Sequence, residues 1–417
     1  MRSFGFLMLG VTLSSVCAIA AAPLAKQDAP REKGAAPGKP SDVAASFQAI
    51  KKETEKKLEP LYAAGNKEVE AAKNEEEREA IQMRIGTEAS KIFKEANDRV
   101  MAAVRDHAAD KGAVEPLVWV VNRSGGSALG DEAAALLQNH HLTNPQTIDL
   151  GYRRKRAPMN WTEPLLRAQL ASSNLPEADR PRLTLALAEV KQTLSALPGI
   201  LAVMSEDHLK QMDRLYGKET VEAFRKIDVA RSEAEAVALY NELAAKYGEK
   251  KIGGAMTFGA LAKSAIFEIQ NLSVGKTAPD IAAEDTDGVP FKLSDYRGKV
   301  VLISFWATWC GPCMAQVPHE REIVERLKDK PFALIGVNGD TDKKQVKEGI
   351  AKAKINWRSF WCGEKGPEGA IPAAWNVRAW PTVYVLDHKG VIRGKELFGK
   401  SLDLMVEKLV REAEEKR

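Results

Sequence analysis

The sequence predicts a helical N-terminal domain followed by a C-terminal α/β domain with a mixed β-sheet. Its 417 residues are enough for two or three domains of about 150 residues each. Residues 41–272 carry apolar side chains at helical spacing, whereas residues 273–417 alternate short apolar runs with amphipathic segments and turn residues. This order predicts packed helical hairpins first and then strands alternating with helices.

Charge and cysteine content narrow the class of protein. Lys and Arg total 61 against 57 for Asp and Glu, and a formal charge of +4 over this length does not indicate nucleic acid as a partner. Four cysteines are too few to build a disulfide scaffold. We therefore expect apolar burial to supply most of the stability, and the positions of the cysteines to matter more than their number.

The N-terminus is typical of an export signal. Arg2 precedes an uncharged stretch over residues 4–22, and Ala18-Ile19-Ala20 fits the small-residue pattern of a signal peptidase site. We predict a signal peptide over residues 1–20, with an uncleaved membrane anchor over residues 4–22 as the alternative. In both cases the body of the protein lies in the periplasm or otherwise outside the cytoplasm, and it contacts a membrane only if the segment stays uncleaved.

The next segments are predicted to be a linker and two long helices. Residues 21–40 are rich in Ala, Pro, Lys and Gly and indicate a disordered linker. Apolar residues recur every three or four positions from Val43 to Leu61 and again from Ile81 to Val104. Pro60 is expected to end or kink the first helix.

The rest of the helical domain has a more broken pattern. Leu239-Tyr240 and the run from Ala244 to Tyr247 resemble tetratricopeptide helices, although the region shows only a loose echo of a repeat. Helices are predicted over residues 117–121, 132–140, 163–171, 181–197, 206–216, 219–225, 234–247 and 257–270.

Helical periodicity gives way to strands near residues 274–280. A hairpin is expected over 285–293, and the continuous apolar run at 299–306 predicts a strand buried on both faces. The remaining predicted elements are a helix at 310–328, a strand at 332–338, a helix at 343–353, a strand at 357–361, a helix at 370–375, strands at 382–387 and 391–398, and a helix at 402–415.

The motif that carries chemistry is Cys310-Gly311-Pro312-Cys313, between the buried strand and the next helix. At a helix N-terminus, unpaired backbone N–H groups and the helix dipole stabilise a thiolate, so Cys310 is the predicted nucleophile. The two-residue spacer brings Cys313 close enough to resolve a mixed disulfide formed by Cys310. A zinc site would need two further ligands at suitable spacing, and a disulfide closing so small a loop adds little stability, so redox chemistry is favoured over both.

Residues from about Val274 onward resemble the thioredoxin-like disulfide oxidoreductases of the TlpA/ResA type, also described as redoxin-domain proteins. The run from Phe305 to Cys313 and the helix-kinking Pro318 carry the resemblance. It implies a thioredoxin-like fold in which the peptide bond before Pro381 is cis and the Trp380 backbone pairs with the substrate chain. Trp309 and Trp380 would then flank the cysteine pair.

Two positions depart from the family pattern. Ser304 stands where thioredoxins have a buried Asp, and Gln316 stands where TlpA/ResA-like proteins often have Glu. The candidates for the group that accepts the Cys313 proton are therefore solvent, Asp340 and Glu320. Cys362 follows a predicted strand, and if that strand is parallel to the one at 299–306, Cys362 lies at the active-site edge of the sheet. The favoured interpretation is a loop thiol without a role, and the alternative is accessory redox pairing.

These features predict an exported enzyme that reduces protein disulfides through its cysteine pair, with no metal and no cofactor. The resemblance implies a membrane electron donor of the DsbD/CcdA kind, because a reductant outside the cytoplasm must be recharged. One alternative is a thiol peroxidase, although Thr308 lies one residue too close to Cys310 for the peroxidase motif. The other is a helical adaptor whose redox fold is a passive module.

Overall fold

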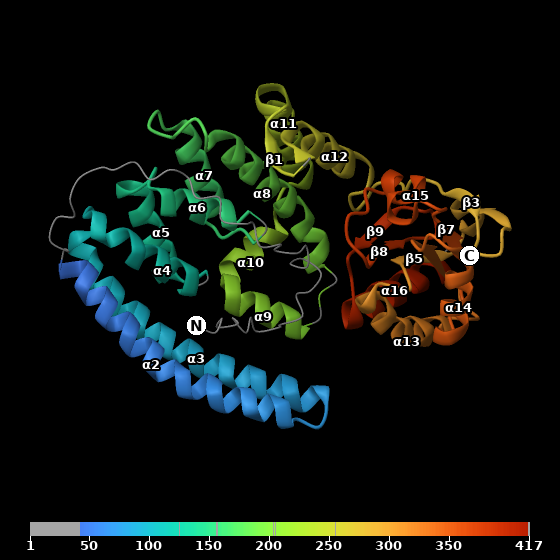
Figure 1. Cartoon of the computed structure of the whole chain (residues 1–417), viewed down its shortest axis with the longest axis horizontal. Helices are drawn as coiled ribbons and strands as arrows, with labels where there is room; N and C mark the ends of the chain where they lie inside the picture. Colours follow the sequence, from blue (N-terminus) through green and yellow to red (C-terminus); the bar gives the residue numbers. More distant parts are fainter. Residues whose placement is uncertain are drawn as a thin grey trace. The chain divides into compact units, whose positions relative to one another are not determined.

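The computed structural model describes residues 42–415, except for residues 125, 156, 203, 205 and 255. It has a helical N-terminal part and a C-terminal part with a mixed sheet, as predicted (Figure 1). The predicted signal peptide and linker lie outside the described residues. Within those residues, no helix combines the length and the apolar character that a membrane crossing requires.

The chain divides into two compact units. The first comprises the described residues up to Val190 together with Gln211–Glu222, and the second comprises Lys191–Lys210 together with the described residues from Ala223 onward. The second unit therefore includes two complete helices that precede residue 273, Val229–Tyr247 and Phe258–Asn271. The domain limits 41–272 and 273–417 stay a prediction from the sequence pattern.

Two 30-residue helices, α2 (Asp42–Ala71) and α3 (Glu75–Val104), pack against each other at the start of the first unit (Figure 1). The first alternative expected for Pro60, that it ends the helix, is wrong, because α2 continues through Pro60 to Ala71. The second alternative, a kink at Pro60, stays a prediction. Pro60 is exposed, and packing along the whole of α2 offsets the one backbone hydrogen bond that proline removes. The break falls instead before Asn74, whose side chain accepts a hydrogen bond from the Glu77 backbone N–H at 2.8 Å.

Except for the helix at Pro145–Arg153, the later helices agree with the predicted positions, usually with longer ends. Their bounds are α4 Val114–Ser124, α5 Ala128–His140, α6 Pro145–Arg153, α7 Thr162–Ala171, α8 Arg180–Leu201, α9 Glu206–Tyr216, α10 Lys218–Arg225, α11 Val229–Tyr247 and α12 Phe258–Asn271.

Two features of this region were not predicted. Helix α6 begins at Pro145 and its N-cap is Asn144, which is a typical start signal for a helix. The apolar pattern that follows is too short to have predicted a helix. A small antiparallel pair, β1 (Lys251–Gly253) and β2 (Met256–Thr257), lies between α11 and α12.

The C-terminal part contains a five-stranded mixed sheet in the order β7-β6-β5-β8-β9. Its central strand β5 is parallel to β6, which is parallel to β7, and antiparallel to β8, which pairs antiparallel with β9. The strand bounds are β5 Val300–Trp306, β6 Phe332–Asn338, β7 Ser359–Trp361, β8 Thr382–Leu386 and β9 Ile392–Lys395. A separate hairpin joins β3 (Ala282–Glu284) to β4 (Pro290–Lys292).

Helices and loops cover both faces of β5, all seven residues of which are buried. Val300 and Leu302 pack in one apolar cluster with side chains of α13 (Gly311–Arg326) and α16 (Gly399–Glu414). Val301, Ile303 and Phe305 pack on the opposite face with residues between 272 and 293 and with Trp375, which follows α15 (Ala370–Ala374). Helix α14 (Lys343–Ala353) joins β6 to β7. Burial on both faces explains the continuous apolar run that predicted this strand.

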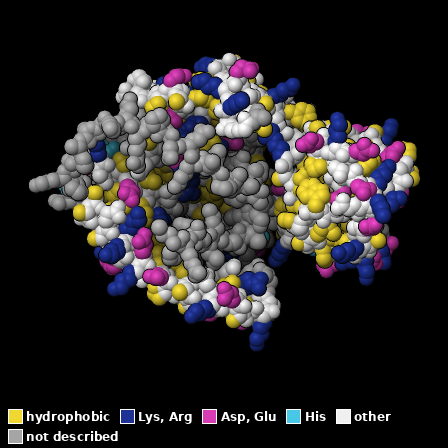
Figure 2. All heavy atoms as spheres, in the orientation of Figure 1, with side chains coloured by type: hydrophobic (Ala, Val, Ile, Leu, Met, Phe, Trp, Pro, Cys, Tyr) yellow, Lys and Arg dark blue, Asp and Glu magenta, His cyan; other side chains and the backbone are white. Residues whose placement is uncertain are grey.

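In space-filling view, acidic and basic side chains are interspersed over the visible face, with apolar patches among them on the C-terminal part of the chain (Figure 2).

Candidate redox site

The two cysteines of the CGPC motif lie where β5 gives way to α13. Cys310 is the N-cap of α13 and Pro312 occupies its first turn. A disulfide of 2.05 Å joins Cys310 to Cys313, and the Cys310 sulfur accepts a hydrogen bond from the Cys313 backbone N–H at 3.2 Å. The first turn of the helix therefore directs a backbone donor at this sulfur, which favours negative charge on it when the disulfide is open.

The disulfide lies at the edge of a small apolar cluster. Cys310 and Cys313 are 5% and 2% exposed and pack with Trp306, Val317 and Ile355. The Trp309 side chain beside them is 54% exposed. An incoming disulfide thus meets an apolar surface around the buried sulfurs.

The structure places Trp380 beside the cysteines, and Pro381 follows it in the chain. The Trp380–Pro381 peptide bond is cis, as the resemblance implied. Trp380 packs against the cluster that contains both cysteines, and its ring meets that of Trp309 edge to face at 5.9 Å. Both Trp380 and Pro381 are half-buried, so part of each remains open to a bound chain.

Asp340 holds the loop that leads into the CGPC motif. It is fully buried, and its carboxylate accepts hydrogen bonds from the Thr308 N–H at 2.9 Å, the Thr308 hydroxyl at 2.6 Å and the Asn338 amide at 2.8 Å. These bonds occupy the carboxylate oxygens and tie the end of β6 to the residues just before Trp309. The sequence pattern indicates Asp340 only as a candidate proton acceptor and gives no signal for Asn338.

Gly339, between these two residues, allows Trp380 to approach the end of β6. A Cβ atom at this position would lie 2.5 Å from the Trp380 ring. Any larger residue would therefore displace the tryptophan that precedes the cis peptide bond.

Glu320 is a buried carboxyl group on the same face of α13 as Cys313. It is 4% exposed, and loss of solvation raises its pKa to about 7, although a hydrogen bond with Ser304 opposes the shift. Seven residues separate Glu320 from Cys313, a distance of about 10 Å along the helix axis. Ser304, where thioredoxins have Asp, is thus the hydrogen-bond partner of a carboxyl group supplied by the helix.

Cys362 follows β7, which is parallel to the central strands as expected. Its backbone N–H donates to the Asn338 carbonyl at 3.0 Å, and its thiol is buried in the core with Phe360 and Trp375. Loss of solvation raises the pKa of this thiol to about 12. It therefore stays protonated at neutral pH and is a poor nucleophile.

Known proteins resemble the part of the chain that carries this site. Residues 273–408 match the Redoxin family. The thioredoxin-like protein YneN of Bacillus subtilis is 37% identical over 121 residues, which cover 28% of this chain and 68% of YneN. The thiol-disulfide oxidoreductase ResA of Geobacillus kaustophilus is 30% identical over 122 residues, covering 29% of this chain and 68% of ResA.

A solved structure, the thioredoxin domain of a thiol-disulfide oxidoreductase from Bacteroides vulgatus, is 31% identical in sequence. The match covers 34% of this chain and 99% of that domain, with a TM-score of 0.32.

Proposed function

Because the chain belongs to the thioredoxin-like thiol-disulfide oxidoreductases, we propose that it reduces disulfides of other proteins through the Cys310–Cys313 pair. The observation that carries the proposal is the pair itself, joined at the N-terminus of α13 and adjoining the cis Trp380–Pro381 bond.

The reaction would proceed by two thiol–disulfide exchanges. The Cys310 thiolate attacks a substrate disulfide, so that a bond forms between Cys310 and one substrate sulfur while the other leaves as a thiolate. Cys313 then loses its proton and attacks the Cys310 sulfur, which releases the second substrate thiol and closes the Cys310–Cys313 disulfide. Two electrons pass to the substrate, and the enzyme is left oxidised.

Trp309, Trp380 and Pro381 would bind the substrate chain. The exposed Trp309 ring offers an apolar contact beside the sulfurs, and the half-buried Trp380 offers its backbone polar groups to an extended chain. Backbone pairing of this kind would accept many sequences, because it reads the main chain rather than the side chains.

Of the two carboxyl groups considered as proton acceptors, Glu320 suits the role better. The Asp340 carboxylate is engaged by Thr308 and Asn338. Glu320, with a pKa of about 7, exchanges protons near neutral pH. At about 10 Å along the helix it would act on the Cys313 thiol through its charge rather than by direct contact.

We further propose that the protein works outside the cytoplasm and is recharged by a membrane electron donor of the DsbD/CcdA kind. The supporting features are the signal-like residues 1–20 and the need for a supply of electrons in an oxidising compartment. An uncleaved segment over residues 4–22 would tether it to the membrane. The helical domain over residues 41–272 would then select partners or position the redox domain.

Turnover of insulin disulfides by the full chain, with dithiothreitol as the electron source, tests the proposed function. We expect catalysed insulin reduction and no turnover of hydrogen peroxide. Peroxide turnover without insulin reduction would favour the thiol peroxidase, and the absence of both would favour the passive adaptor.

A further inference from the structure

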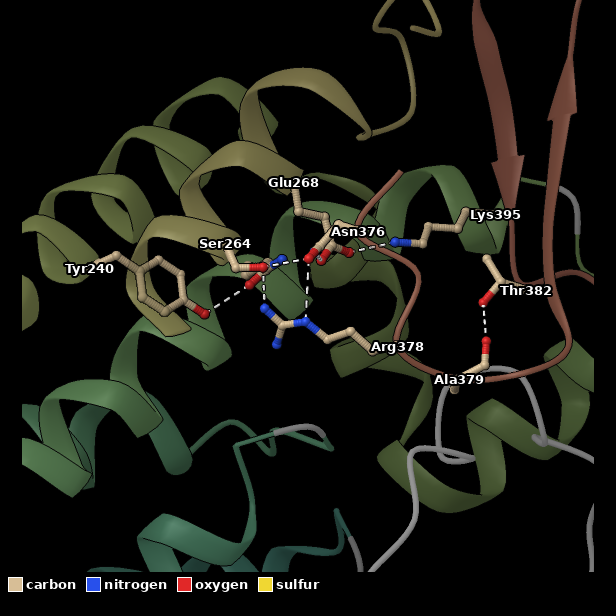
Figure 3. A network of polar contacts seen from close by, with 9 residues as sticks. Tyr240, Ser264, Glu268, Asn376, Arg378, Ala379, Thr382 and Lys395 are labelled. Atoms are coloured by element: carbon tan, nitrogen blue, oxygen red, sulfur yellow. Dashed lines mark hydrogen bonds and ion pairs between the residues drawn. The ribbon is translucent and has the colours of Figure 1, made fainter. Parts of the chain in front are cut away.

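Helix α12, which precedes the Redoxin match, contacts the segment that ends in the cis peptide bond. Ser264 and Glu268 lie one turn apart on α12, and both face residues between α15 and β8 (Figure 3). The two partners there are Asn376 and Arg378, more than 100 residues later in the chain.

The contacts form a closed polar network. The Ser264 hydroxyl donates to the Asn376 side-chain oxygen, and the Asn376 amide donates to the Glu268 carboxylate at 2.9 Å. Arg378 donates to the Ser264 oxygen, and also to the Asn376 oxygen at 3.3 Å. Both polar atoms of the Asn376 side chain are therefore bound by α12.

Asn376 also has an unusual backbone conformation. Its φ of +49° lies in the left-handed region, which asparagine tolerates better than most residues, and it directs the chain away from α15. Four residues later the chain reaches Trp380. The orientation of Asn376 thus sets the direction in which the chain approaches the cis bond.

The other end of the same segment is held from within the sheet domain. The Thr382 hydroxyl donates to the Ala379 carbonyl at 2.8 Å, and the Glu396 carboxyl group hydrogen-bonds to Thr382. The Trp380–Pro381 bond therefore lies between Thr382 at the start of β8 and the residues that α12 binds, Asn376 and Arg378.

Glu268 itself is anchored to the sheet. Its second carboxylate oxygen forms an ion pair with Lys395 of β9, whose ammonium lies 5.3 Å from the centre of the Tyr384 ring on β8. Glu268 therefore links the sheet and the segment before Pro381 through one carboxylate.

We propose that Ser264 and Glu268 are positioning residues of the substrate site. They fix Asn376 and Arg378, and thereby hold the Trp380 backbone at the distance from Cys310 that a bound protein chain requires. This inference rests on the proposed function. It implies that α12, which precedes the Redoxin match and belongs to the same compact unit as the sheet, supplies a component of the redox site.

The test compares two substrates in the full chain. Insulin needs the backbone-pairing site, whereas dithiothreitol needs only access to the sulfurs. For Ser264→Ala and for Arg378→Ala, we expect kcat/KM for insulin to fall about tenfold, mainly through KM, which is the effect of losing roughly one hydrogen bond to a charged group. Exchange with dithiothreitol and the Cys310–Cys313 reduction potential should stay unchanged.

Two further variants serve as controls. Ser264→Thr keeps the hydroxyl group and should retain insulin reduction, and Gln270→Ala changes an exposed residue of the same helix and should have no effect. Because Arg378 is exposed, Arg378→Ala tests the network without disturbing the core.

Wild-type kinetics with insulin in both alanine variants would overturn the inference, as would an equal loss with insulin and dithiothreitol. Either result leaves the proposed function standing if the unmodified chain reduces insulin. Failure of the unmodified chain to reduce insulin would instead refute the proposed function itself.

Discussion

A Cys313→Ser variant should accumulate a mixed disulfide between Cys310 and its substrate, and turnover should fall by at least about a thousandfold. Cys310 would still attack the substrate, because the first turn of α13 directs the Cys313 backbone N–H at its sulfur. With no thiol at position 313, the bond between Cys310 and the substrate could not be resolved. Non-reducing electrophoresis and mass spectrometry of the complex with insulin would detect it.

Two matched variants complete this experiment. Cys310→Ser should lose turnover to the same extent and form no mixed disulfide. Cys362→Ser should behave as the unmodified chain does, because the Cys362 thiol is buried and its raised pKa of about 12 keeps it protonated. A mixed disulfide that formed in Cys310→Ser and not in Cys313→Ser would reverse the two roles.

Replacing Glu320 with glutamine should make the protein more stable above pH 7 and change how stability depends on pH. The folded-state pKa of Glu320 is about 7, against 4.5 for the ordinary group, so folding takes up a proton between these values. The free energy of unfolding contributed by this group therefore falls as pH rises from 4.5 through 7, by about 3 kcal/mol at 1.36 kcal/mol per pKa unit. A glutamine side chain does not ionise, so the variant does not lose this free energy of unfolding as the pH rises.

Urea unfolding of both proteins at pH 4 and pH 8 would measure the difference. We expect the variant to gain as much as about 3 kcal/mol relative to the unmodified protein on going from pH 4 to pH 8, less any change in the bond to Ser304. Glu322→Gln alters an exposed residue on the same helix and serves as the control. Parallel pH profiles for Glu320→Gln and the unmodified protein would contradict the assigned burial of an ionisable carboxyl group.

The sequence contained enough information to predict the C-terminal fold and the cysteine pair. The apolar run of β5 and the glycine, proline and cysteines that follow are local signals, and a local signal can be interpreted without the tertiary structure. The cis bond before Pro381 was predicted by resemblance, which placed Trp380 beside the cysteines.

Contacts between residues that are distant in the sequence could not be predicted from local patterns. In the sequence, Ser304 is a departure from the family pattern and Glu320 is a candidate proton acceptor, and nothing links the two. The packing of α13 on β5 shows that their side chains form a hydrogen bond. Asn376 and Arg378 gave no signal of their partners on α12, because polar pairs separated by more than 100 residues leave no periodic pattern. The first helix does not end at Pro60, because tertiary packing overrides the local preference of proline.

The proposed reaction requires that Cys310 and Cys313 form one reversible two-electron couple. The most direct test equilibrates the full chain with graded ratios of reduced and oxidised dithiothreitol, alkylates the free thiols and counts the labels on each cysteine by mass spectrometry. We predict that Cys310 and Cys313 become labelled together along a single curve, in which a tenfold change in the equilibrium corresponds to about 30 mV. Labelling of the two residues at separate potentials, or a disulfide that stays closed at every ratio, would show that the two cysteines do not form such a couple.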